Sequence, residues 1–192
     1  MAKRPACYLI IAGLLSLGLL GADGTAADTP ASAPQLAAVE RLLRTVAKEL
    51  ADPSDRAAIR QLIDVFTARG ELSDDRSVWM LLTFDREGRL SAVTVNADVL
   101  LAAPPLIQRA AILHELEHLN HATETRQLLN TFVGRDRPPG RREDLAASVL
   151  RFQQLIRVMV DDECRAYRRG LRSIDDAVQA HGGLAAYLAT LP

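Results

Sequence analysis

The most informative stretch of the sequence is Ala111–His121, which reads AILHELEHLNH. It lies inside an apolar segment that opens after Pro104-Pro105 and runs to about Leu129, a pattern that predicts one helix. The segment is apolar around most of its circumference, so we expect this helix in the core. His114 and His118 are four residues apart, which places both imidazoles on one face of it, about one turn apart.

This spacing lets both imidazoles reach a single Zn²⁺ ion, whose bonds to histidine nitrogen are about 2.0–2.1 Å long. Glu115 flanks the same face and can sit beside a metal-activated water without being a ligand, as a general base must. The alternative is a polar stripe on a surface helix that binds no metal. The apolar context favours the metal, because buried polar groups need partners.

A catalytic zinc ion takes three protein ligands and keeps one open position. Two downstream acids compete for the third ligand. Glu124 follows His118 at the spacing of metzincins, but the turn in those proteins needs glycine at the position of His121, and their ligand is histidine. Glu163 follows His118 by 45 residues in a second long helical pattern, and it can face the two histidines if the helices pack together. A solvated acidic face is the alternative for Glu163.

Taken together, His114-Glu115-x-x-His118 and a helical Glu163 resemble the gluzincin branch of the zincin-like metalloproteases, in a minimal version. The resemblance covers residues 77–167. It implies that His114, His118 and Glu163 bind one zinc ion per chain and that Glu115 is the catalytic base. It also implies that the strand Arg89–Asn96 is the sheet edge along which an extended peptide substrate pairs.

Some positions depart from the family pattern. Glu117 puts a charge inside the motif, where it is either an acceptor behind the metal ligands or simply exposed. In the family, an acidic residue often follows the third ligand by four residues and orients a histidine. That position is Tyr167 here, so Asp161 and Asp162 are the candidates for this orienting role. Tyr167 can stabilise an oxyanion or be a core residue. His121 can bind substrate or be a surface or capping residue.

The remaining patterns predict an α+β fold, a mostly helical zincin-like domain with a short antiparallel β-hairpin packed on the motif helix. Ser54 is the predicted cap of the second helix and Gly70 its end. Residues 86–88 are the predicted turn of the hairpin. The expected elements are amphipathic helices at 35–50 and 55–69, strands at 77–85 and 89–96, a long helix at 143–174 and a short helix after Gly182-Gly183.

The N-terminus has the organisation of a secretory signal peptide. Lys3 and Arg4 precede the apolar run Tyr8–Leu20, and small residues follow. A helix of this length rises only about 20 Å, which is short of a membrane span. We therefore expect cleavage after Ala27, no stable membrane span afterwards, a flexible leader at 28–34, and one domain at 35–192 in a bacterial periplasm or outside the cell.

Charge and cysteine content exclude some classes of function and fold. The 192 residues carry 23 Lys+Arg against 24 Asp+Glu, a formal net charge of −1 that gives no basic excess for a nucleic-acid partner. Two cysteines are too few for a fold held by disulfides. The expected function is a zinc-dependent peptidase acting on peptides or proteins. The alternatives are a non-catalytic periplasmic binding or assembly protein and a zinc amidase acting on cell-wall material. The sequence leaves the oligomeric state open.

Overall fold

The computed structural model describes residues 32–85, 87–133 and 142–190. Six helices and three strands lie within these residues, so the predicted α+β, mostly helical fold is confirmed. The predicted signal peptide and the first part of the predicted leader lie outside the described residues. No helix in the described ranges is both long enough and apolar enough to cross a membrane.

The first two helices, α1 (Ser32–Glu49) and α2 (Pro53–Arg69), pack against each other. α1 begins at Ser32, so the last three residues assigned to the leader are helical. Pro34 fits the first turn, where a missing N–H breaks no helical hydrogen bond. The cap of α2 is Asp52 rather than Ser54. Its carboxylate accepts hydrogen bonds from the N–H groups of Ser54 and Asp55.

Gly70 ends α2, as predicted, and starts the first strand. A Cβ atom at this position would lie 2.5 Å from the carbonyl oxygen of Phe66 and 2.7 Å from its ring. Only glycine therefore lets the chain leave the helix over the Phe66 ring and continue directly as a strand.

The sheet has three strands, β1 (Gly70–Leu72), β2 (Met80–Phe84) and β3 (Leu90–Val95), in the order β1-β3-β2. The predicted hairpin is confirmed, because β2 and β3 pair antiparallel across a turn that contains Gly88 at φ 80°. The sheet is mixed rather than antiparallel, since β1 pairs parallel with β3. β3 is thus the central strand, and the expectation that 89–96 forms the sheet edge is wrong. Hydrogen bonding to β1 occupies its second side, and β2 is the edge next to α4.

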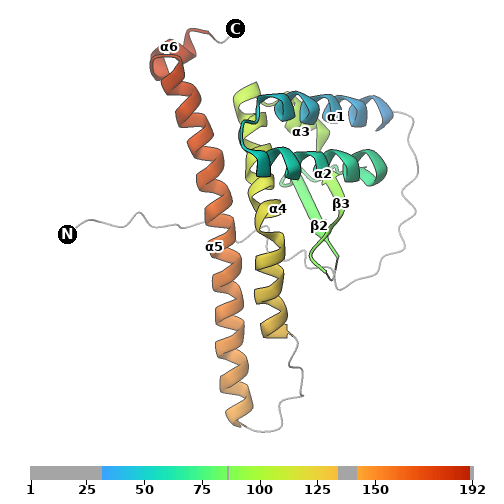
Figure 1. Ribbon diagram of the computed structural model, residues 1–192, viewed down its shortest axis with the longest axis vertical. Coiled ribbons are helices and arrows are strands. Elements are labelled where there is room, and N and C mark those ends of the chain that lie inside the picture. Colours follow the sequence, from blue (N-terminus) through green and yellow to red (C-terminus); the bar gives the residue numbers. More distant parts are fainter. Residues whose placement is uncertain (1–31, 86, 134–141, 191–192) are drawn as a thin grey trace, which may run out of the picture.

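The long helices are α4 (Pro105–Val133) and α5 (Arg142–Ala180), which lie side by side, with α5 on the outer side of α4 (Figure 1). The short helix α3 (Ala97–Ala102) precedes α4. α5 extends six residues beyond its predicted end at Ile174. Gly182 and Gly183, both at positive φ, then separate it from α6 (Leu184–Leu188), as predicted.

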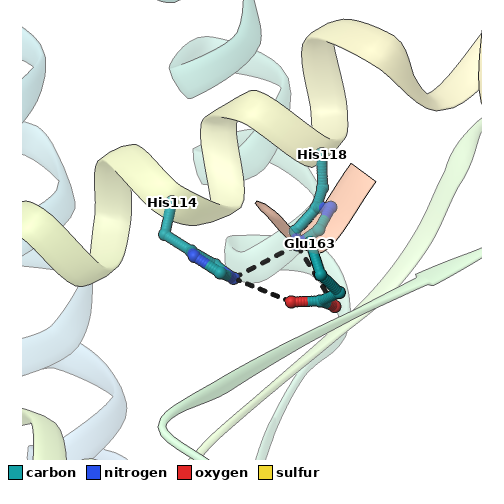
Figure 2. Close-up of side chains that lie close together, drawn as sticks. All are labelled: His114, His118 and Glu163. Atoms are coloured by element: carbon teal, nitrogen blue, oxygen red, sulfur yellow. Dashed lines mark hydrogen bonds and ion pairs between the residues drawn. The ribbon is translucent and has the colours of Figure 1, made fainter. Parts of the chain in front are cut away.

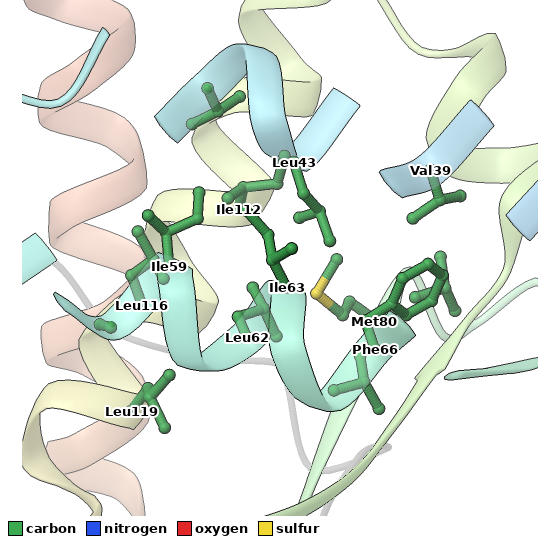
Figure 3. Packing of buried hydrophobic residues seen from close by; sticks show 14 of the residues in the cluster. Val39, Leu43, Ile59, Leu62, Ile63, Phe66, Met80, Ile112, Leu116 and Leu119 are labelled. Carbon is green, nitrogen blue, oxygen red and sulfur yellow. The ribbon is translucent and has the colours of Figure 1, made fainter. Parts of the chain in front are cut away.

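The hydrophobic core lies between α1, α2, the sheet and one face of α4, and α2 packs across β3 (Figure 3). Among the described side chains, α5 contributes only Ala166 to the buried apolar set. α5 is therefore attached to the outside of the core through α4. The largest fully buried side chains are Leu43, Ile59, Leu62, Leu100, Ile112, Leu116, Val39, Val93 and Val95.

Candidate metal centre

His114 and His118 project from one face of α4, as their four-residue spacing predicts (Figure 2). Their Nε2 atoms lie 3.2 Å apart and their rings meet edge to face. Both side chains are largely buried. The two nitrogens therefore converge on one point instead of facing bulk solvent.

Glu163 approaches the same point from α5 (Figure 2). Its Oε2 lies 3.7 Å from Nε2 of His114, and its Oε1 lies 3.6 Å from Nε2 of His118. One ligand atom from each of the three residues lies within 4.8 Å of the others, so this group could hold a metal ion. Its carboxylate is the most exposed of the three, with 41% of the side chain accessible, so the group opens to solvent on this side.

The spacing of these atoms is close to what one bound metal ion requires. Three ligand atoms bound tetrahedrally at about 2.0–2.2 Å lie about 3.4 Å from one another. The two imidazole nitrogens are 3.2 Å apart, and each has a different oxygen of the Glu163 carboxylate at 3.6 to 3.7 Å. One ligand atom from each residue lies within 4.8 Å of the other two, so a modest inward movement of Glu163 would reach that value. Two imidazole nitrogens and one carboxylate oxygen are also a donor set that catalytic zinc sites use, with a fourth position left open.

Small residues on α5 bring Glu163 close enough to reach the histidines. Ala166 is fully buried, and at Gly170 a Cβ atom would lie 3.0 Å from the carbonyl oxygen of Ala110 on α4. Both residues lie within two turns of Glu163, so the backbones of α4 and α5 approach closely where the ligand is needed. A larger side chain at either position would push the carboxylate away from the two rings.

Asp162 holds the second histidine in place from behind. Its Oδ2 accepts a hydrogen bond from Nδ1 of His118 at 2.8 Å, and the carboxylate is largely buried. Burial alone would raise the pKa of Asp162, but its hydrogen bond to His118 and the nearby Arg165 outweigh burial and lower it. An ionised Asp162 fixes the proton on Nδ1, which leaves the lone pair of Nε2 directed at the ligand group.

The two histidines have opposite pKa shifts. Burial, aided by the neighbouring His118, lowers the pKa of His114 to about 4, so its ring is neutral and able to donate a lone pair at pH 7. Burial also acts to lower the pKa of His118. The hydrogen bond to Asp162 and the carboxylates of Glu115 and Glu163 outweigh burial and raise it. This concentration of negative charge around His118 is also what attracts a cation.

Glu115 lies next to the ligand group without belonging to it. Its Oε1 is 4.0 Å from Nε2 of His114, and the side chain is largely buried. Burial raises the pKa of this carboxyl group to about 7. A carboxylate whose pKa is close to the working pH is well suited to accept and return a proton.

Tyr167 packs against the first histidine, with ring centroids 4.6 Å apart in an edge-to-face contact. The ring is partly exposed, so Tyr167 is not a core residue, which was one of the two roles predicted for it. Burial and the carboxylates of Glu163 and Glu115 raise the pKa of its hydroxyl group, which is therefore a hydrogen-bond donor at neutral pH.

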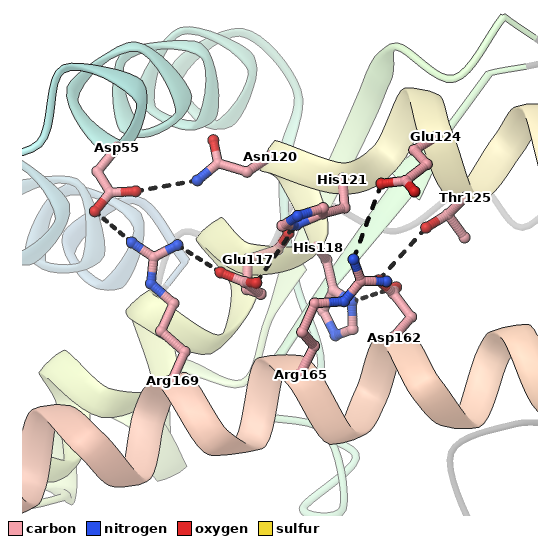
Figure 4. A network of polar contacts seen from close by, with 10 residues as sticks. All are labelled: Asp55, Glu117, His118, Asn120, His121, Glu124, Thr125, Asp162, Arg165 and Arg169. Carbon is pink, nitrogen blue, oxygen red and sulfur yellow. Dashed lines mark hydrogen bonds and ion pairs between the residues drawn. The ribbon is translucent and has the colours of Figure 1, made fainter.

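The structure separates other candidates from the centre. Glu124 interacts with Arg165 at 3.9 Å and is mostly exposed, so it is not in the group of ligand atoms. Nδ1 of His121 donates to the backbone oxygen of Glu117 at 3.0 Å, and it lies 3.5 Å from a carboxylate oxygen of the same residue. His121 thus belongs to the polar network of Figure 4 instead of the group of His114, His118 and Glu163.

That network explains Glu117, the unexpected charge in the motif. The guanidinium of Arg169 on α5 donates to Glu117 at 2.7 Å and to Asp55 on α2, and Asn120 donates to Asp55 at 3.0 Å (Figure 4). Glu117 is therefore neither exposed nor an acceptor behind a metal ligand. It ties α4 to α5, and sequence reasoning missed this because no local pattern links residues 52 and 114 positions apart.

If the group of His114, His118 and Glu163 binds a metal ion, Asp162→Asn is expected to weaken its affinity for Zn²⁺, used as the probe, about 10- to 100-fold, because the neutral amide no longer orients and polarises His118. Competition with a chromogenic chelator measures this affinity directly. Asp161→Asn is the matched control, since it removes the same charge from the adjacent, exposed position. Equal affinities for the two variants would contradict the assigned role of Asp162.

Comparisons of the chain with protein-family models, with curated proteins and with solved structures find no match in any of the three.

Proposed function

We propose that this protein is a zinc-dependent peptidase of the gluzincin type, acting on peptides or proteins in the periplasm or outside the cell. The observation that carries the proposal is the convergence of His114, His118 and Glu163, from two helices, with one ligand atom of each within 4.8 Å of the others. The buried Glu115 beside them adds the general base that such a reaction needs.

A zinc ion held by the three residues would supply a Lewis acid that polarises a peptide carbonyl and lowers the pKa of water. Glu115 accepts the proton of the attacking water at its carboxylate and then delivers it to the nitrogen of the leaving amine. Asp162 keeps the proton on Nδ1 of His118 during the cycle. The hydroxyl group of Tyr167, beside His114, is placed to donate to the carbonyl oxygen as it gains negative charge.

The substrate is best aligned by β2, the edge strand next to α4. Its outer backbone groups have no partner strand in the described sheet, so an extended peptide can pair with them. β2 therefore takes the role of pairing with the substrate, which the sequence had assigned to the central strand β3.

The test begins with metal analysis of the purified protein. Mass spectrometry is expected to find one zinc ion per chain, and dialysis against a chelator should abolish hydrolysis of a denatured protein substrate until Zn²⁺ is restored. His114→Ala should lose both metal and activity. His181→Ala, which changes an exposed histidine at the end of α5, should keep both.

The outcomes separate the candidate functions. A protein with no zinc, whose melting behaviour and activity are unchanged by chelation, contradicts the proposal. Zinc binding without hydrolysis of any peptide favours the non-catalytic binding or assembly protein. Hydrolysis of whole peptidoglycan, with denatured protein left intact, favours the cell-wall amidase.

A further inference from the structure

One face of α5 is apolar and exposed. The core does not cover the apolar side chains of this face, because α5 contacts the rest of the fold mainly through α4. Six of these side chains are 40% to 62% exposed. We call them the α5 apolar stripe: Val149, Phe152, Ile156, Val160, Tyr167 and Leu171.

The stripe is continuous with the candidate metal centre. Phe152, Ile156, Glu163 and Tyr167 follow one another at intervals of four, seven and four residues, which places them on the same face of α5. Tyr167 contacts His114, so the stripe passes directly beside the ligand group. Ile156 and Phe152 lie about 10 and 16 Å from Glu163 along the helix axis, a distance that three to five extended residues can span.

We propose that the α5 apolar stripe binds an apolar segment of the polypeptide substrate, so that the enzyme selects unfolded proteins with exposed apolar stretches. This inference rests on the proposed peptidase function. Glu163 is the one charged member of this face between Phe152 and Leu171, so an apolar chain meets no other charge there. A second copy of the chain bound permanently to the stripe would cover the side on which the metal centre opens and would block access to it. A substrate that binds and leaves would not.

The test compares two variants of the full zinc-loaded chain. Phe152→Ser/Ile156→Ser removes apolar surface from the stripe, far from the metal ligands. Leu150→Ser is the matched control, because Leu150 is 59% exposed on the same helix but faces away from Glu163. The substrates are reduced, carboxymethylated α-lactalbumin, which stays unfolded, and a short polar peptide.

The stripe variant is expected to raise KM for the unfolded protein about 10-fold, because two apolar contacts are lost. Its kcat/KM for the short peptide and its zinc content should equal those of the wild type. Leu150→Ser should change none of these quantities. An unchanged KM in the stripe variant overturns the inference while leaving the peptidase function intact.

A binding measurement separates the two proposals. The Kd of zinc-loaded Glu115→Gln for the fluorescently labelled unfolded protein should rise about 10-fold when the stripe substitutions are added. If the Kd rises in this way while the wild type hydrolyses no peptide, the binding role of the stripe is supported and the peptidase proposal is contradicted. Two results overturn the stripe proposal: a wild-type dimer in sedimentation that the stripe variant dissociates, or stripe-dependent binding to vesicles of phosphatidylethanolamine and phosphatidylglycerol with no effect on protein binding.

Discussion

Glu115→Gln is expected to lower kcat for peptide hydrolysis about 10³-fold while the protein keeps its zinc and its fold. The glutamine side chain has the same size, so it fits the same buried position beside His114. It has no carboxylate to take a proton from the attacking water, and the leaving amine then receives none from this residue. Steady-state kinetics on a quenched fluorescent peptide, together with metal analysis of the same preparation, measures both quantities.

Glu124→Gln is the control for this experiment, because Glu124 is an exposed glutamate on the same helix and outside the ligand group. Its activity should match that of the wild type. Near-normal turnover in Glu115→Gln would contradict the assignment of the general base. Loss of zinc from that variant would instead place Glu115 among the groups that hold the metal.

Arg169→Met is expected to lower the free energy of unfolding by about 3 kcal/mol, since removing one partner of a buried ion pair leaves the others uncompensated. Arg169 is the shared partner of Asp55 and Glu117, whose carboxylates are largely buried. Methionine keeps much of the apolar stem, so the measured loss reports mainly the charge. Urea denaturation followed by circular dichroism measures the effect.

The matched control is Arg44→Met, which removes an arginine from an exposed pair with Glu40 within α1. Such surface pairs contribute about 0.5 kcal/mol or less, so this variant should unfold close to the wild type. Equal losses in the two variants would show that the network of Asp55, Glu117 and Arg169 contributes no more than a surface ion pair.

The sequence was most informative where the relevant geometry is local. The face shared by His114 and His118 follows from helical spacing within one segment, and apolar periodicity was enough to predict α4. The hairpin of β2 and β3 was predictable for the same reason, because a tight turn joins two adjacent strands. β1 was missed, since three residues after a helix are too few to show a strand pattern.

Contacts between distant segments could not be predicted in the same way. Sequence reasoning left Asp161 and Asp162 open as partners of a histidine. The rotation of α5 about its axis brings Asp162 to His118. That rotation depends on how Ala166 and Gly170 pack against α4, which no pattern within α5 reveals. The pairing of Glu117 with Arg169 and the central place of β3 in the sheet depend on tertiary packing too.

By itself, then, the sequence determined every described helix except the short α3, the hairpin, and the side of α4 on which two imidazoles lie. Each of these follows from interactions between residues near one another in the chain. Only the tertiary structure decided that Glu163 meets them and that the apolar face of α5 stays exposed. Periodicity shows that a helix has an apolar face. What covers that face depends on which other elements pack against it.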